Sequence, residues 1–253
     1  MTDIQKAAVS KRISALLLDA LLIVVLTVIL MTLLSKITRY DSYADRLEEY
    51  YNTYEERYGI DFDILPEDYE KLTDAEKAVY DEAKAALESD PDAVYDYNTV
   101  INLTLFMISV SLFLSFAVFE FVMPLVFGNG MTVGKKVFGL AVMRTNSVKA
   151  GNAQIFVRSM LGKFTFETMI PVLIAIMIYF GTLGGLGFIL LFGIAVLQTV
   201  FIIVTKKNQA IHDLLADTVV VDFGSQNIFP DEESLNRYLE DPDGYTEREQ
   251  EKH

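Results

Sequence analysis

The sequence predicts an all-α membrane protein, a four-helix transmembrane bundle with a helical acidic insert outside the membrane and a short β-ribbon. Three observations lead to this fold class. The 253 residues are 52% hydrophobic, and the apolar residues form long uninterrupted tracts. The acidic residues gather between those tracts, so that segment 36–97 has 19 acids and 7 bases. Segment 121–166, by contrast, has six bases and no acid.

The first apolar tract, residues 13–34, predicts a membrane-spanning helix. Its 22 residues extend for about 33 Å as an α-helix, and a bilayer core is about 30 Å thick. Lys6, Lys11 and Arg12 precede the tract. A cleaved signal peptide would have a shorter apolar region and a small-residue cleavage site, so we interpret this tract as a retained first helix.

Two further tracts predict three more helices. Residues 100–127 form the second helix and carry Glu120 and Pro124 near its end. The third tract, 164–205, is apolar over 42 residues except for Glu167, which is too long for one span. A glycine-rich turn at 181–187 divides it into two helices, at about 164–180 and 186–205.

The distribution of Lys and Arg predicts the orientation in a plasma membrane, because basic residues are enriched in cytoplasmic loops. Basic residues occur in the N terminus, in the 128–163 loop and at Lys206 and Lys207. This distribution predicts that both termini are in the cytoplasm and that the acidic insert is outside. The predicted segments are 1–35 (N terminus and first helix), 36–98 (acidic extracytoplasmic insert), 99–127 (second helix), 128–163 (basic cytoplasmic loop), 164–205 (third and fourth helices), 206–223 (cytoplasmic His-Asp segment and strand) and 224–253 (acidic cytoplasmic tail).

Local patterns predict the structure of the segments between the spans. Helices are expected at 41–58 and 66–89, with Pro66 in a first turn and Thr73 and Glu76 as a capping box. Tyrosines and a leucine recur every three or four residues from Tyr43 to Tyr54, as on one packed helix face. The β-prone stretches 139–145 and 218–223 are too short to span a membrane, and we expect them to pair as a small ribbon.

Acids inside the predicted spans are the candidate functional residues. A carboxylate at the centre of a span costs about 2.5–3.5 kcal/mol, so Asp19 needs a protein or water environment and a partner. Arg12 lies two turns earlier on the same helix face. The pair is either a cation or proton site or a structural ion pair. Glu120 is expected to pair with Arg12 or the basic loop, and Glu167 is favoured by its place near a helix start.

Other chemistries are not supported by the sequence. The net charge of −14 and the segregated acids exclude a basic nucleic-acid-binding face. Absence of cysteine excludes disulfides and thiolate metal sites. The Gly128–Lys136 segment lacks the spacing of a phosphate-binding loop. His212 and Asp213 are too few for a metal site and are expected to form a structural hydrogen-bonded pair. We therefore expect no enzyme, no cofactor and no metal.

Together these segments resemble the RDD family of integral membrane proteins, which is named for one arginine and two aspartates. The resemblance covers about residues 8–35 and 99–222 and is carried by KRISALLLDALLI, GNGMTVGKKVFGLAVMR and NQAIHDLLADTVVV. It implies that the named residues are Arg12, Asp19 and Asp213. The family's cytoplasmic motif and its frequent arginine correspond to Gly130, Thr132, Gly134, Lys135, Gly139, Leu140, Val142 and Arg158. Asn208 and Asp217 depart from the common pattern, and the 36–97 insert is unusually long.

Two functions remain open. In the first, the protein transports a small cation or solute, with Asp19 as the binding group, Arg12 as its charge partner and Glu120 as a second acid. A bundle this small would then form a homo-oligomer or bind another membrane protein. In the second, the protein is a membrane scaffold or sensor whose acidic outer lobe binds a cationic partner, and Arg12, Asp19 and Asp213 are structural ties.

Overall fold

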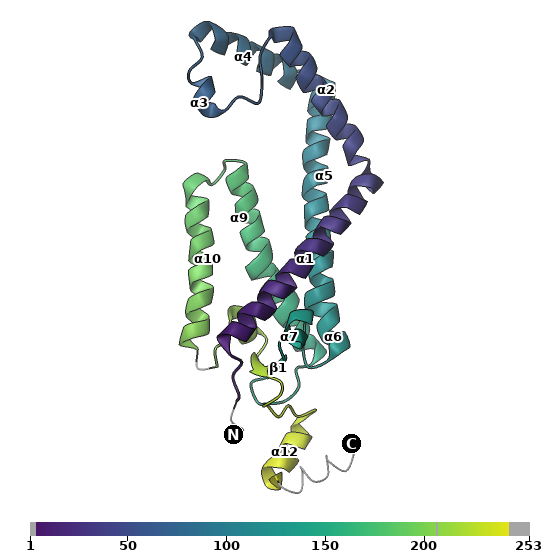
Figure 1. The fold of residues 1–253 in the computed structure, drawn as a ribbon, viewed down its shortest axis with the longest axis vertical. Coiled ribbons are helices and arrows are strands. Elements are labelled where there is room, and N and C mark those ends of the chain that lie inside the picture. The colour runs from purple at the N-terminus through teal and green to yellow at the C-terminus, as the bar shows by residue number, and fades with distance from the viewer. Residues whose placement is uncertain (1–3, 206, 243–253) are drawn as a thin grey trace. The chain divides into compact units, whose positions relative to one another are not determined.

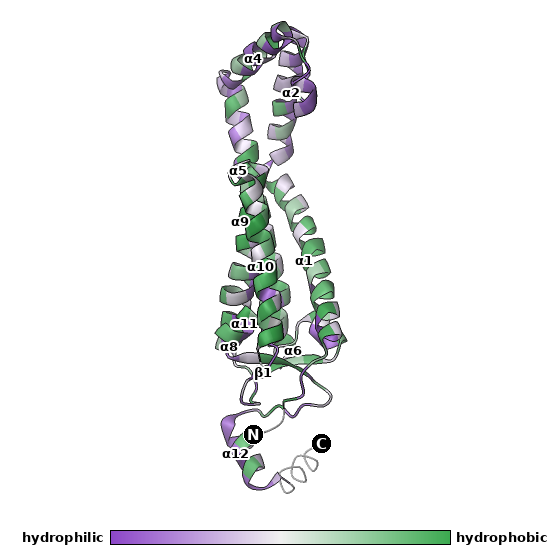
Figure 2. Cartoon of the chain, turned by 90° about the vertical axis from the view of Figure 1, so that its left-hand side faces the viewer, coloured by the Kyte–Doolittle hydropathy of each residue, from purple (hydrophilic) through white to green (hydrophobic). Residues whose placement is uncertain are grey.

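The computed structural model describes residues 4–205 and 207–242. Within these residues it has four helices long and apolar enough to cross a membrane, which confirms the four predicted spans. They are Val9–Thr38, Pro91–Phe127, Asn152–Tyr179 and Gly184–Phe201. Hydrophobic residues predominate along α1, α9 and α10 (Figure 2). Leu17 is 63% exposed and Ile203 is 74% exposed, as expected of side chains that face lipid.

The second and third spans each combine several helical elements, of which α5, α6 and α9 are labelled in Figure 1. The first span is α1 alone (Val9–Thr38). The second comprises α5 (Pro91–Phe116), η1 (Ala117–Val122) and α6 (Met123–Phe127). The third comprises α8 (Asn152–Phe156), η2 (Val157–Met169) and α9 (Ile170–Tyr179). The fourth lies within α10 (Gly184–Val204). η1 and η2 are π-helical, a wider winding that often occurs at functional sites.

The third span begins at Asn152 and not near residue 164, and this corrects two expectations. Arg158 and Lys163 belong to the helix and not to a 128–163 loop, and Glu167 lies inside the helix and not near its start. The helix continues through these residues because their charged groups turn inward and find partners. The remaining part of the predicted loop holds α7 (Val133–Val137) and β1 (Leu140–Arg144).

The chain divides into two compact units that we describe separately. One unit contains the described residues up to Val25 and from Phe113 onward, and the other is Leu26–Leu112. In the first unit, α9 and α10 form a helical hairpin, joined at Gly181 in the left-handed conformation (φ 71°). This confirms the predicted glycine turn.

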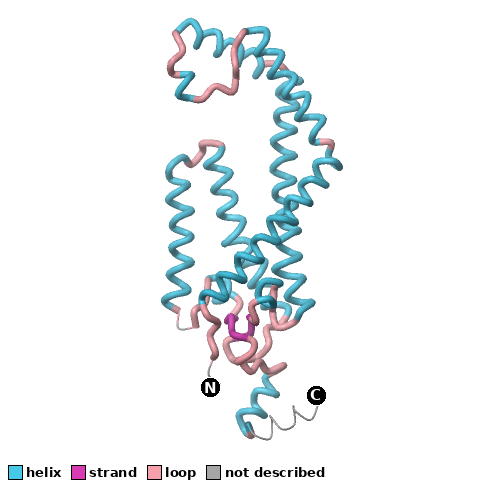
Figure 3. Tube along the Cα trace, viewed as in Figure 1, coloured by secondary structure: helices cyan, strands magenta, loops and turns pink. Residues whose placement is uncertain are grey.

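A two-stranded antiparallel sheet lies in the first unit (Figure 3). β1 pairs with β2 (Thr218–Asp222), with Leu140 opposite Asp222 and Arg144 opposite Thr218. The predicted pairing of the two β-prone stretches is therefore confirmed. Alternate residues of the ribbon pack into two apolar clusters, one around Leu140 and Val142 and the other around Ala141 and Met143. Burial on both faces makes the ribbon a rigid base for the adjacent helix ends.

Two short helices complete the first unit. α11 (Ile211–Leu215) immediately precedes β2 and packs against η2. α12 (Glu232–Glu240) follows the sheet, and its N-terminal residue Glu232 forms an ion pair with Arg144 at 2.9 Å. Residues 243–253 of the predicted acidic tail lie outside the described residues, as does Lys206.

The second unit contains the acidic insert. Its helices are α2 (Tyr40–Tyr58), α3 (Pro66–Tyr69) and α4 (Asp74–Glu88). Thr73 and Glu76 form the capping box of α4, and Pro66 occupies the first turn of α3, so one predicted helix over 66–89 is two. The tyrosine face of α2 packs with Leu87 and Ala93 around the buried Tyr54. Arg46 binds the buried Asp96 with two hydrogen bonds of 2.7 and 2.8 Å.

Candidate binding cavity

A cavity of about 550 Å³ lies within the first unit and collects most of the predicted site residues. One wall is apolar and comes from α1, including Ile13, Leu16 and Ile23. The remaining lining comes from η1, α7, η2, α10 and α11, among other residues. The ionisable residues that line the cavity are Arg12, Asp19, Glu120, Lys135, Arg158, Lys163, Glu167 and His212. Such a concentration of charge beside apolar spans needs a specific arrangement of partners.

Asp19 binds only neutral donors. Its side chain is nearly inaccessible, with 2% of the residue exposed. One carboxylate oxygen accepts a hydrogen bond from the Thr132 hydroxyl at 2.5 Å, and the other accepts one from the Gly134 backbone N–H at 2.7 Å. No ion pair to Asp19 is present among the described residues. The carboxylate is thus oriented by the turn that begins α7, while its charge is left without a cationic side chain.

Gly134 is required for this close contact between α1 and α7. A Cβ atom at position 134 would lie 2.2 Å from the Ala15 carbonyl oxygen and 2.9 Å from an Asp19 carboxylate oxygen. Backbone oxygen cannot move aside without displacing α1. The motif glycine therefore has a specific steric role. Gly130 has a related one, because its φ is 59° and a Cβ there would lie 2.7 Å from Val142.

Arg12 and Arg158 both bind Asp213, which is fully buried. Arg12 Nη2 lies 3.4 Å from the Asp213 carboxylate, and Arg12 Nη1 donates to the Asn208 carbonyl oxygen at 2.5 Å. Arg158 forms a direct ion pair with the same carboxylate. The expected pairing of Arg12 with Asp19 is thus replaced by pairing with Asp213. Asp213 ties α1 and η2 to α11.

Glu120 on η1 forms an ion pair with Lys163 on η2, and this pair joins the two elements. The Glu120 side chain is buried, with 4% exposed, and the Lys163 side chain is partly buried, with 12% exposed. Glu120 thus finds its partner in the basic 128–163 segment, one of the two alternatives that the sequence offered. Lys163 was not predicted from the sequence as the partner of Glu120. Lys163 lies four residues before Glu167, a spacing that places these two side chains on the same helix face.

His212 contacts Glu167, not Asp213. Its Nδ1 meets the Glu167 carboxylate, whereas its Nε2 is 3.7 Å from Asp213, which is too long for a hydrogen bond. The expected His-Asp pair is therefore wrong. Burial, with the nearby Arg158 charge next in importance, lowers the pKa of His212 to about 4, so the neutral ring donates an Nδ1–H hydrogen bond to Glu167 at pH 7. Gly162 makes room for this contact, since a Cβ there would lie 2.6 Å from the His212 Cβ.

Lys135 is the remaining cation of the cavity. It is 8% exposed, and its ammonium group donates to the Thr132 hydroxyl oxygen at 3.2 Å. No carboxylate lies within 4 Å of it in the described part of the chain. Burial lowers the pKa of Lys135 to about 8, while the charges of Glu120 and Asp19 act in the opposite direction. Thr132, which caps α7, therefore stands between an unpaired anion and an unpaired cation.

Comparison with known proteins identifies the family of the chain. The model of the RDD family matches residues 6–217. The chain belongs to the RDD family. Members of this family are membrane proteins, which accounts for the four apolar helices. No match was found among curated proteins or among solved structures.

The three residues that the resemblance implies as the family's named arginine and aspartates occupy two clusters. Arg12 and Asp213 form one cluster with Arg158, and Asp19 forms the other with Thr132 and Gly134. The motif residue Gly139 takes a left-handed conformation (φ 66°) where α7 leads into β1. The signature thus builds a region of opposed charges. Within the described residues, one of its acids, Asp19, and one of its bases, Lys135, have no ion-pair partner.

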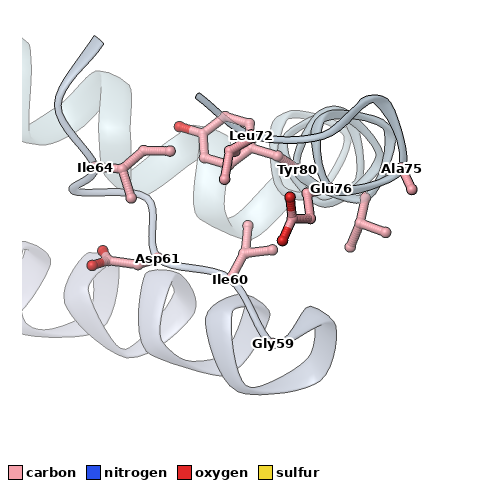
Figure 4. Close-up of a pocket in the computed structure, with 9 residues that line it drawn as sticks. Gly59, Ile60, Asp61, Ile64, Leu72, Ala75, Glu76 and Tyr80 are labelled. Atoms are coloured by element: carbon pink, nitrogen blue, oxygen red, sulfur yellow. The ribbon is translucent and has the colours of Figure 1, made fainter. Parts of the chain in front are cut away.

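The second unit has a separate hollow of about 410 Å³. It is lined by the loop that follows α2, including Ile60 and Asp61, and by residues of α4, including Glu76 and Tyr80 (Figure 4). Glu76 is already engaged in the capping box. Across the described residues of both units, no group of three or more His, Asp or Glu side chains is placed to hold a metal ion.

Proposed function

We propose that this RDD protein transports a small cation or solute across the membrane, with Asp19 as the binding group. The observation that carries the proposal is the buried Asp19 carboxylate, which lines a cavity and has neutral donors but no cationic partner among residues 4–205 and 207–242. A buried negative charge is costly unless a cation or a proton neutralises it. A mobile cation at Asp19 supplies that neutralisation.

Glu120 serves as a second acid on the path, since it also lines the cavity. Its ion pair with Lys163 must open before it can bind a passing cation, so Asp19 is the first site to be occupied. Arg12 acts indirectly, without binding the cation. It holds Asp213, and through it α11 and η2, in the positions that form the cavity.

The distribution of basic residues supports a cytoplasmic location for both termini in a plasma membrane. In that orientation the cavity, which lies near the start of α1, is on the cytoplasmic side. The apolar faces of the four spans contact lipid. A homo-oligomer would supply the additional helices that a continuous path requires, because four helices enclose little space.

Flux into proteoliposomes tests this function. Proteoliposomes with purified wild type are expected to take up the cation or solute in a cation-dependent way. Asp19→Asn is expected to abolish this uptake, because asparagine keeps the shape of the side chain but removes its negative charge. Asp92→Asn, at an exposed position at the start of α5, is the matched control and retains uptake. Equal uptake by wild type and Asp19→Asn, or uptake by neither, would rule the proposal out.

A second candidate function is a scaffold or sensor that binds a cationic partner through the insert. It is favoured by a hollow of about 400 Å³ on α2 whose lining includes Asp45, Glu48, Glu49 and Glu56. Deleting residues 40–95 separates the two functions. The scaffold function requires that the deletion abolish partner capture, and the transport function requires that uptake persist.

A further inference from the structure

The hydrogen bonds around Thr132 connect the two unpaired charges of the cavity. The Thr132 hydroxyl donates to Asp19 at 2.5 Å, and its oxygen accepts from Lys135 Nζ at 3.2 Å. The ammonium group is therefore two hydrogen bonds away from the carboxylate. Because the hydroxyl proton points to Asp19, the oxygen acts as an acceptor toward Lys135, from both its backbone N–H and its Nζ, each at 3.2 Å. All three residues are buried.

Two influences act on the Lys135 ammonium group: its hydrogen bond to the Thr132 hydroxyl and the charges of the neighbouring side chains. Asp19 on α1 and Glu120 on η1 attract its charge, while Arg158 and Lys163 on η2 repel it. A lysine stem is flexible and carries a compact point charge. A short movement of that stem brings the ammonium group closer to either acid. Nothing comparable is available to Arg12 or Arg158, whose guanidinium groups are held by Asp213.

A cation that binds Asp19 therefore meets a positive charge already present beside the site. Two like charges a few ångströms apart in a poorly solvated region repel strongly, by an amount that changes a dissociation constant about tenfold to hundredfold. From this geometry we infer that Lys135 is a tethered competitor for the Asp19 site, a built-in ammonium ion that weakens the binding of a monovalent cation and promotes its release.

This inference rests on the proposed function, and it assigns to Lys135 a role in setting the affinity of the Asp19 site for cations. The tether accounts for the presence of a buried lysine that has no ion pair in the described chain, which is otherwise costly. Burial also makes the ammonium group easier to deprotonate, since the pKa of Lys135 is about 8. The competitor is accordingly removable in two ways, by movement of the stem or by loss of its proton.

Equilibrium binding tests the inference separately from transport. The full chain in detergent is titrated with NaCl and, in a second series, KCl by calorimetry, in wild type, Lys135→Gln and the double variant Asp19→Asn/Lys135→Gln. Removing the tether is expected to lower the dissociation constant for at least one ion by about tenfold or more. The double variant is expected to lose that gain. Lys136→Gln is the matched control, because Lys136 is exposed and lies 4.0 Å from the Phe127 ring centroid.

Each outcome bears on one proposal. Tighter binding in Lys135→Gln that depends on Asp19 supports the tether, whether or not wild type gives flux. Equal affinity in wild type and Lys135→Gln, including binding to neither, overturns it. Absence of Asp19-dependent flux in wild type overturns transport alone. If Lys135→Gln does not fold, Lys135→Met gives the same comparison, because its unbranched apolar side chain fills similar volume.

Discussion

Arg12 on α1 and Asp213 on α11 are 201 positions apart in the chain, and their side chains meet at 3.4 Å in the interior of the first unit. Asp213 also accepts a hydrogen bond from the Ala210 backbone N–H at 3.1 Å and binds Arg158. The first and third spans are thus fastened to α11, and through it to the strand β2. Arg12 and Asp213 therefore share one set of contacts, and Asp19 makes a different set with Thr132 and Gly134.

The charge of Asp213 is expected to be essential for stability. Asp213→Asn leaves the guanidinium groups of Arg12 and Arg158 buried without a carboxylate, which should lower the free energy of unfolding by about 3–5 kcal/mol. Unfolding in mixed micelles, followed by circular dichroism, measures this loss. Glu233→Gln is the control, since its pair with Arg237 is exposed, and it should leave the curve unchanged. Similar curves for Asp213→Asn and wild type would contradict the prediction.

The sequence predicts that Asp19 lies inside a span, but it does not predict which residues bind the carboxylate, because helix geometry keeps Asp19 apart from the expected partner. Arg12 precedes Asp19 by seven residues, which places both on one helix face but separates them by about 10.5 Å along the axis. That spacing lets both line one cavity and prevents direct pairing. The actual partners, Thr132 and Gly134, are more than one hundred positions away, and only the tertiary fold brings them to α1.

The start of the third span was harder to predict from the sequence, for a different reason. Hydropathy identifies residues that meet lipid, so it marked α9 and the last part of η2 but missed α8 and residues 157–163 of η2. Arg158, Lys163 and Glu167 are compatible with a helix in this position because each binds a partner inside the unit. The ribbon was predictable, in contrast, because two β-prone stretches too short to span a membrane needed partners for their backbone groups.

Gly134→Ala tests the close approach of α7 to α1. The added methyl group would overlap the Ala15 carbonyl oxygen, so α1 must shift, at a cost of about 1–3 kcal/mol in unfolding free energy. The shift should also weaken cation binding at Asp19. Gly193→Ala is the control, because a Cβ atom at position 193 would have no heavy atom within 4 Å and alanine favours a helix. Equal stability of the two variants would show that α1 and α7 can separate freely.

His212 is expected to make the protein less stable in mild acid. Its pKa is about 4 in the folded state and about 6.5 when unfolded. Both states are neutral well above pH 6.5, so the group has no effect there. As the pH falls from 6.5 to 4, the unfolded state binds a proton that the folded state does not, and stability decreases, by about 3 kcal/mol at most.

Comparing His212→Gln with wild type isolates this effect from the titration of carboxylates. Unfolding free energies are measured at half-unit intervals from pH 4 to pH 7. The difference between the two proteins should be constant above pH 6.5 and should change steadily below it, in the direction that favours the variant. A difference that stays constant over the whole range would mean that the folded state protonates His212 readily.

Thr132 provides the most direct test of the link between Asp19 and Lys135. Thr132→Val preserves the side-chain shape but removes the hydroxyl, so the buried Asp19 loses one of two donors and Lys135 loses its acceptor. Unpaired buried polar groups cost about 1–3 kcal/mol each, and we expect lower stability together with reduced Asp19-dependent uptake. Thr132→Ser restores the hydroxyl and should recover both properties. Thr199→Val is the control, because the Thr199 hydroxyl donates to the Ala195 carbonyl of its own helix at 2.9 Å. If Thr132→Val behaves like wild type and Thr132→Ser does not, the methyl group, and not the hydroxyl bridge, is what position 132 supplies.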